Sequence, residues 1–299
     1  MKSSKVKGSI FIFLGASCYG MLGVYVKMAY HSGYTTGEVT LAQFLLGFAM
    51  LLVLNLFRST QKEKKNIKVP IKSKLLLMIA GTSLGLTSIF YYLAVSYIPV
   101  SVCIVLLMQM VWLGVLLEMV VTRKLPERRK AFAALIVIIG SVLATKLFQQ
   151  SISLNWKGII MGIMAAICYT ATMYSTKNIK AEYSPYQRSL YMIFGGFIII
   201  LLVFHSSINL NFNYSIFFSW GIIISLFGTV IPPLLFTAGM PLTGIGLGGI
   251  LASIEIPVAV LASALILNED VTLSQWLGII LILLAVGLMN FHTKRWNKI

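Results

Sequence analysis

Long apolar stretches alternate with short polar connections along the whole chain. Ten such stretches can be delimited, and each is close to the roughly 20 residues that a helix needs to cross a bilayer. They lie at approximately 8–29, 36–57, 74–95, 100–121, 131–148, 157–176, 187–204, 216–237, 244–267 and 274–292. The pattern therefore predicts an all-α polytopic membrane protein with ten transmembrane helices.

The first half of this pattern is similar to the second half. GSIFIFLGASCYGMLGVYVK at 8–27 aligns without gaps with GIIMGIMAAICYTATMYSTK at 158–177, which pairs Tyr19 with Tyr169. Because five is an odd number, two five-helix halves enter the membrane in opposite directions. We expect an inverted five-plus-five repeat made of residues 1–150 and 151–299, an architecture that lets one site face either side of the membrane in turn.

Composition supports the membrane assignment and argues against a soluble domain and against a nucleic-acid-binding protein. The chain is 58% hydrophobic and 11% charged, whereas soluble domains are about 45–50% apolar and about 25% charged. A net charge of +16 is common in nucleic-acid-binding proteins, but here the bases lie between apolar stretches and not on one folded face. We therefore expect the lipid bilayer as a partner and no nucleic acid. The three cysteines lie inside apolar stretches, so neither a disulfide framework nor a metal site is predicted, and no cofactor is expected.

The connecting segments differ sharply in charge. If the amino terminus is cytoplasmic, 21 of the 24 Lys and Arg residues lie on the cytoplasmic side. They are Lys2, Lys5 and Lys7, seven bases within 58–74, five from Arg123 to Lys130, then Lys177, Lys180, Arg188, Lys294, Arg295 and Lys298. The positive-inside rule thus predicts a multi-pass protein of the cell (inner or plasma) membrane with both termini in the cytoplasm.

Glu255 stands near the middle of the ninth apolar stretch. An ionised side chain at that depth costs about 2.5–3.5 kcal/mol on insertion-based scales. Pro257 follows two residues later and removes a backbone donor at the same depth. Small residues share a helix face with the carboxyl, namely Gly244, Gly248, Ala252, Ala259 and Ala262. This arrangement favours a substrate or proton-coupling site at Glu255; the alternative is a carboxyl that only fixes helix packing.

A few other polar and aromatic residues at membrane depth are candidates for the same site. Gln109 occupies the position in the first half that corresponds to Glu255, and Trp112 lies one turn further on the same face. Buried phenols usually need hydrogen-bond partners, although each aromatic residue alone is more often a core residue. The predicted substrate-binding set is Glu255, Gln109, Trp112, Tyr19, Tyr169 and Tyr92. Softened helices are expected at Pro232, Pro233 and Pro257, and Glu118 is expected to have a structural partner near Arg123.

These features together resemble the EamA branch of the drug/metabolite transporter superfamily. The resemblance rests on the ten-helix repeat, on SIEIPVAVLASALILNE at 253–269 and on QWLGIILILLAVGL at 275–288. Glu255, Pro257 and Glu269 match the family pattern in the second half. The first half departs from it, with Gln109, Val111 and Arg123 in the corresponding places. The resemblance implies a secondary transporter, often an exporter, for amino acids or other small metabolites.

The sequence therefore predicts a secondary active transporter of small metabolites that works by alternating access, with possible proton coupling at Glu255. It is not expected to be an enzyme, and no Walker motif for nucleotide hydrolysis is present. A passive channel or facilitator along the same path is the first alternative. A membrane-embedded enzyme is a more distant one.

Overall fold

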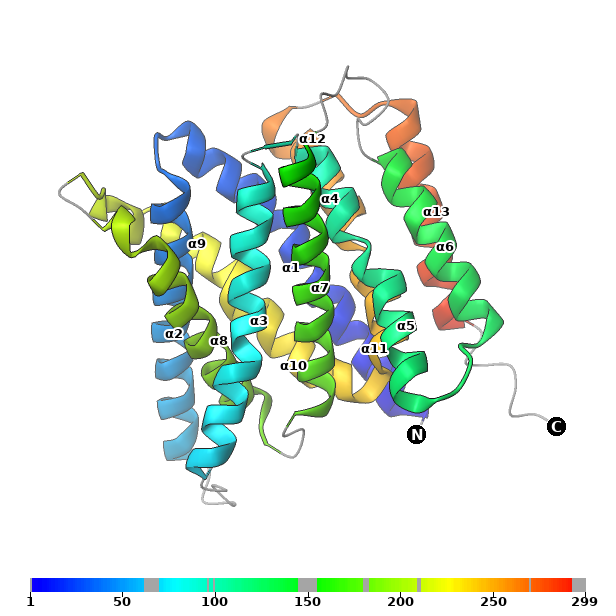
Figure 1. The fold of residues 1–299 in the computed structure, drawn as a ribbon, viewed down its shortest axis with the longest axis horizontal. Helices are drawn as coiled ribbons and strands as arrows, with labels where there is room; N and C mark the ends of the chain where they lie inside the picture. Colours follow the sequence, from blue (N-terminus) through cyan, green and yellow to red (C-terminus); the bar gives the residue numbers. More distant parts are fainter. Residues whose placement is uncertain are drawn as a thin grey trace.

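The computed structural model describes residues 2–61, 70–95, 97–98, 100–144, 155–179, 183–208, 211–268 and 270–291, and no β-strand occurs within these ranges. The fold is a bundle of long helices whose axes run mostly between the top and the bottom of the view in Figure 1. The first-half helices are α1 (Lys2–His31), α2 (Thr36–Gln61), α3 (Ile71–Val95), α4 (Val100–Leu107), α5 (Met110–Thr122) and α6 (Arg128–Ala144). The second-half helices are α7 (Trp156–Asn178), α8 (Pro185–Phe204), α9 (Trp220–Ser225), α10 (Ile231–Thr243), α11 (Ile245–Ala252), α12 (Glu255–Leu267) and α13 (Leu273–Phe291). Short 3-10 helices η2 (His205–Ser207) and η3 (Tyr214–Phe217) and the π-helix η4 (Leu226–Val230) complete the described structure.

Eight segments of the described chain are long and apolar enough to cross a membrane. They are Ser4–His31, Thr36–Phe57, Ile71–Ala94, Val102–Thr122, Trp156–Asn178, Pro185–Ser207, Trp220–Thr243 and Ile245–Leu267. The helices α6, with 17 residues, and α13, whose apolar part is Leu273–Met289, are shorter. The all-α membrane fold is thus confirmed for the described residues, while the count of ten spans stays a prediction.

Several of these spans are interrupted near their middle. The α4–α5 pair breaks at Met108 and Gln109, and the α11–α12 pair breaks at Ser253 and Ile254. At both breaks the backbone closes tighter turns, such as Val111 N to Met108 O at 3.0 Å and Ile256 N to Ser253 O at 3.1 Å. The span of α9 and α10 is interrupted by η4. The α4–α5 break and the α11–α12 break fall at corresponding positions of the two halves in the repeat alignment.

Helices from opposite halves make much of the packing. In the first half, α1 packs against α10 and α12, and α3 packs against α7 and α8. The α3–α8 contact is the tightest, because a Cβ added to Gly81 would overlap the backbone of Met192, and one added to Gly195 would overlap the backbone of Met78. The predicted small-residue face beside Glu255 is different: a Cβ on Gly248 would meet the flexible side chain of Met240 and not a backbone.

Several residues of the sequence analysis lie outside the described part of the chain. They include residues 62–69 of the basic connection, the outer connection before Trp156, Glu269, Lys180 and the basic residues after 291. The orientation of the protein in the membrane therefore stays a prediction, and it is tested best at described connections on opposite ends of the bundle.

Leu125 and Phe218 provide that test. Leu125 lies in the α5–α6 connection, at the end of the bundle that carries the amino terminus, and Phe218 follows η3 at the other end. Each side chain is 87% exposed. In a variant without the native cysteines Cys18, Cys103 and Cys168, Phe218→Cys should react with an impermeant thiol reagent added to intact cells, whereas Leu125→Cys should react only after permeabilisation. The opposite pattern would reverse the predicted topology.

Candidate functional site

A cavity of about 550 Å³ lies inside the bundle, with walls from both halves of the chain. It extends from the middle of α1, at Tyr19, toward the end of that helix, at Lys27 and Tyr30. Its deep end contains Glu255 and Tyr169, and its other end contains Asp270. The volume is within the range of small-molecule sites, which are about 300–1,000 Å³.

Glu255 is the first residue of α12 and faces this cavity. The break after α11 ends one helix before it, and Pro257 stands in the first turn of the next, where a missing N–H costs no helical hydrogen bond. The Oε2 atom of Glu255 is buried and has no hydrogen-bond partner among the described residues. Buried polar atoms are nearly always satisfied, so this oxygen is available to a proton or a ligand.

The repeat mates Tyr19 and Tyr169 meet at the deep end of the cavity. Their rings lie edge to face with centroids 6.4 Å apart, and Tyr19 also packs on Phe236 at 5.7 Å. The side chain of Tyr169 is 8% exposed, and its hydroxyl has no hydrogen-bond partner among the described residues. This hydroxyl lies within interaction range of the Glu255 carboxyl but outside ordinary hydrogen-bond geometry. Two unsatisfied polar groups therefore share the bottom of one cavity.

The cavity wall formed by α2 and α3 is also polar and aromatic. Tyr92 lines the cavity and donates a long hydrogen bond of 3.5 Å from its hydroxyl to Oε1 of Gln43. Thr87, Ser88 and Tyr91 line the same wall. Gln43 was not among the predicted residues, although an amide inside the second apolar stretch is the same signal that singled out Gln109.

Gln109 and Trp112 are not among the residues that line the described cavity. Trp112 donates its indole N–H to Oε1 of Gln109 at 2.8 Å, and Gln109 donates from Nε2 to the carbonyl of Val105 at 2.9 Å. Trp112 is 41% exposed on the outer surface of the bundle. The break between α4 and α5 offers Gln109 a local backbone partner, so its amide is satisfied beside the break and away from the cavity.

The predicted helix breaks coincide with irregular backbone. Pro232 and Pro233 stand in the first turn of α10, directly after the π-helix η4. Sequence reasoning missed Pro241, which lies inside α10 near its end, and the turn at Gly244, where φ is +88°. The irregular span of η4 and α10 borders the large cavity, because Gly228 of η4 lines it.

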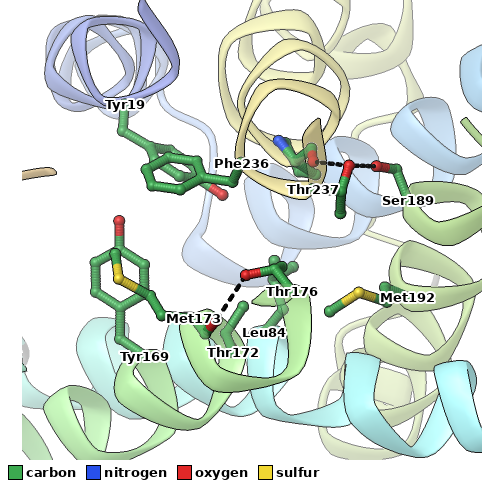
Figure 2. Close-up of a pocket in the computed structure, with 11 residues that line it drawn as sticks. Tyr19, Leu84, Tyr169, Thr172, Met173, Thr176, Ser189, Met192, Phe236 and Thr237 are labelled. Carbon is green, nitrogen blue, oxygen red and sulfur yellow. Dashed lines mark hydrogen bonds between the residues drawn. The ribbon is translucent and has the colours of Figure 1, made fainter. Parts of the chain in front are cut away.

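A second, small cavity continues from the deep end toward the amino-terminal end of the bundle (Figure 2). Its volume is about 20 Å³, which is room for about one water molecule. Tyr19 and Tyr169 belong to the walls of both cavities. Hydroxyl groups also line the small cavity, from Thr172, Thr176, Ser189 and Thr237. Figure 2 shows Ser189 and Thr237 joined by a hydrogen bond, whose length is 3.0 Å.

Arg188 lies next to this small cavity. It was counted among the bases on the cytoplasmic side, and its side chain is only 1% exposed. Ser184 caps α8, so Arg188 falls in the first turn of that helix and points inward. Its guanidinium donates to the carbonyl of Thr176 in α7 and, at 2.7 Å, to that of Thr237 in α10. Arg188 therefore ties three helices together at this end.

Glu118 has a structural partner in α6. Its Oε2 pairs with the ammonium group of Lys130 in α6 at 3.2 Å. The carboxylate also lies against the turn between α10 and α11, where a Cβ on Gly244 would be 3.4 Å from Oε1. Glu118 does not line the large cavity of the described residues.

Comparisons with known proteins agree with this architecture. The sequence model of the EamA-like transporter family matches the chain twice, over residues 6–146 and 156–291. An uncharacterized transporter of Archaeoglobus fulgidus is 25% identical over 285 residues, which is 93% of this chain and 94% of the relative. A solved crystal structure shares the fold, with a TM-score of 0.77 and 13% identity over 96% of both chains. The chain therefore belongs to the EamA-like transporter family and is a multi-pass membrane transporter.

Proposed function

We propose that this protein is a secondary active transporter of small metabolites, amino acids or similar compounds, which exports its substrate by alternating access. The observation that carries the proposal is the cavity of about 550 Å³ that ends at a buried carboxyl oxygen without a hydrogen-bond partner among the described residues. A site of this kind near the middle of a bundle is where secondary transporters bind substrate and coupling ion.

The proposed architecture is an inverted repeat of ten helices, with residues 1–150 and 151–299 as its halves. Two observations support it. The family model matches once in each half, and the helix pairs α4–α5 and α11–α12 break at corresponding places. In this arrangement α6 and α13, which pack against each other, are the fifth and tenth membrane helices. Broken helices at matching positions are typical of transport sites.

The shape of the cavities supports alternating access. The large cavity extends toward the end of the bundle opposite the amino terminus. With cytoplasmic termini, this conformation is open to the outside. Toward the cytoplasmic side, Tyr19 and Tyr169 line both this cavity and the small hydroxyl-lined cavity, and Arg188 ties α7, α8 and α10 together. In the proposed cycle, these contacts separate when the site faces the cytoplasm.

Glu255 is proposed to couple transport to the proton gradient. The titratable side chains within electrostatic range of its carboxyl are the phenols of Tyr19, Tyr91 and Tyr169 from α1, α3 and α7. Lys27 and Asp270 line the cavity further toward its mouth. A carboxyl among phenols and apolar groups is costly to leave ionised and uncompensated, so a proton and a ligand can replace each other there.

Gly23 offers a direct test of the transport path. It lines the large cavity, and a Cβ added to it would meet no atom within 4 Å. Gly23→Trp should therefore fill the cavity without disturbing helix packing. Leu14→Trp, on the lipid-facing side of α1, is the matched control.

Metabolites whose levels differ between cells with and without the protein would be tested for counterflow in liposomes that contain the purified protein. We expect saturable counterflow in the wild type and in Leu14→Trp, and none in Gly23→Trp. Conductance without saturation would favour a channel. Unchanged counterflow in Gly23→Trp would show that the substrate does not pass through this cavity.

A further inference from the structure

We infer that the large cavity selects protonated amines with an apolar body over α-amino acids. This inference rests on the proposed transport function and narrows its substrate class. It follows from the charges at the two ends of the cavity, their separation along α1, and the aromatic side chains between them.

The charged groups of the cavity are unevenly placed. Among the described residues that line it, Glu255 is the one Asp, Glu, Lys or Arg side chain at the deep end. Lys27 and Asp270 are at the mouth. A ligand that reaches the bottom therefore meets a carboxyl group and no cation.

Glu255 and Lys27 lie at different levels of the cavity along α1. A Cβ placed on Gly20 would lie 2.6 Å from the backbone oxygen of Glu255, which sets these two residues at the same level. Lys27 is seven residues further along α1, or about 10 Å at the helical rise. The ammonium and carboxylate of an α-amino acid are attached to the same carbon atom. If its ammonium binds Glu255, its carboxylate is held beside the Glu255 carboxyl at the deep end, about two helical turns from the level of the Lys27 backbone, which is unfavourable.

The polar atoms at the deep end match an ammonium group well. Oε2 of Glu255 and the hydroxyl of Tyr169 both lack hydrogen-bond partners among the described residues. An ammonium group has three donors, so it can satisfy both oxygen atoms at once. A carboxylate has acceptors only and leaves Oε2 of an ionised Glu255 unsatisfied.

The cavity walls between Glu255 and the mouth can bind the apolar body of a protonated amine. Five tyrosines line the cavity: Tyr19, Tyr30, Tyr91, Tyr92 and Tyr169. Aromatic faces attract organic cations and bury apolar groups. An arylalkyl ammonium ion therefore matches both the carboxyl group at the deep end and the aromatic walls.

Three compounds with one phenyl body and different charges test the inference: 2-phenylethylamine, phenylalanine and 3-phenylpropionate. Uptake of each would be measured with the purified full-length protein in proteoliposomes at neutral pH. We expect the KM for the amine to be at least about tenfold lower than that for phenylalanine, because the zwitterion buries an unpaired carboxylate. 3-Phenylpropionate should not be transported.

Glu255→Gln should remove the preference for the amine, whereas Glu127→Gln should keep it. Glu127 is an exposed carboxylate before α6 and not part of the cavity. Equal or better transport of phenylalanine would overturn the amine inference and leave the transport proposal intact. Absence of saturable amine uptake would also overturn it, and the Gly23→Trp counterflow test would then decide separately whether the cavity transports another metabolite.

Discussion

Gly81→Leu is expected to abolish the accumulation of folded protein in the membrane. A Cβ at this position would overlap the backbone of Met192 in α8, and the reciprocal Gly195 of α8 meets the backbone of Met78 in α3. A flexible side chain can move aside, but these obstacles are main-chain atoms, so the two helices would have to separate. Overpacking typically costs about 1–3 kcal/mol even where side chains can adjust, and the total stability of a domain is only about 5–15 kcal/mol.

The measurement is the amount of monodisperse protein after mild detergent extraction, compared at equal expression. Gly23→Leu is the matched control, because the same substitution there enters open space. Gly81→Ala should give an intermediate loss. Wild-type abundance and thermal stability in Gly81→Leu would mean that α3 and α8 do not cross as closely as the structure shows.

The importance of Gly81 and Gly195 was not predictable from the sequence, and the reason is general. Hydrophobic length identifies the membrane helices one at a time, which is why the apolar stretches agree with the described helices. Whether two glycines face each other depends on which helices pack together. The helices α3 and α8 come from different halves of the chain, so their pairing is not visible in either apolar stretch. Sequence reasoning chose the small residues near Glu255 instead, where the structure places the side chain of Met240 against Gly248.

Some of the residues singled out in the sequence lie together in the structure and others do not, and the difference has a physical basis. Glu255, Tyr19, Tyr169 and Tyr92 line one cavity, whereas Gln109 and Trp112 bind each other outside its described walls. An amide has a donor and an acceptor and is easily satisfied by a broken helix turn, as Gln109 is by Val105. A carboxyl group has no such simple local solution at membrane depth, so Glu255 was the stronger signal.

Arg188 shows the converse limit. The positive-inside rule counts Lys and Arg residues near the ends of membrane spans whatever their burial. It does not register that a capped first turn can direct the guanidinium inward toward free carbonyl groups of two other helices. A buried arginine at a helix end is therefore invisible to charge counting and emerges only from the packing of α7, α8 and α10.

Glu255→Gln is expected to abolish pH-driven accumulation of substrate while leaving counterflow exchange partly intact. Glutamine keeps the size of the side chain and most of its hydrogen bonding, but it cannot take up or release a proton. If a proton and the substrate alternate at Glu255, the variant can still bind and exchange substrate, with weaker affinity for a cation. It cannot use the gradient, so accumulation should fall to the level of empty liposomes.

The measurement compares accumulation under an imposed pH gradient with counterflow at equal pH on both sides, in the same proteoliposomes. Glu127→Gln, which removes an exposed carboxylate outside the cavity, should behave like the wild type in both. Full gradient-driven accumulation in Glu255→Gln, with unchanged pH dependence, would mean that the carboxyl only fixes helix packing. Loss of counterflow as well as accumulation, at normal abundance, would mean that Glu255 binds the substrate so directly that coupling cannot be separated from recognition.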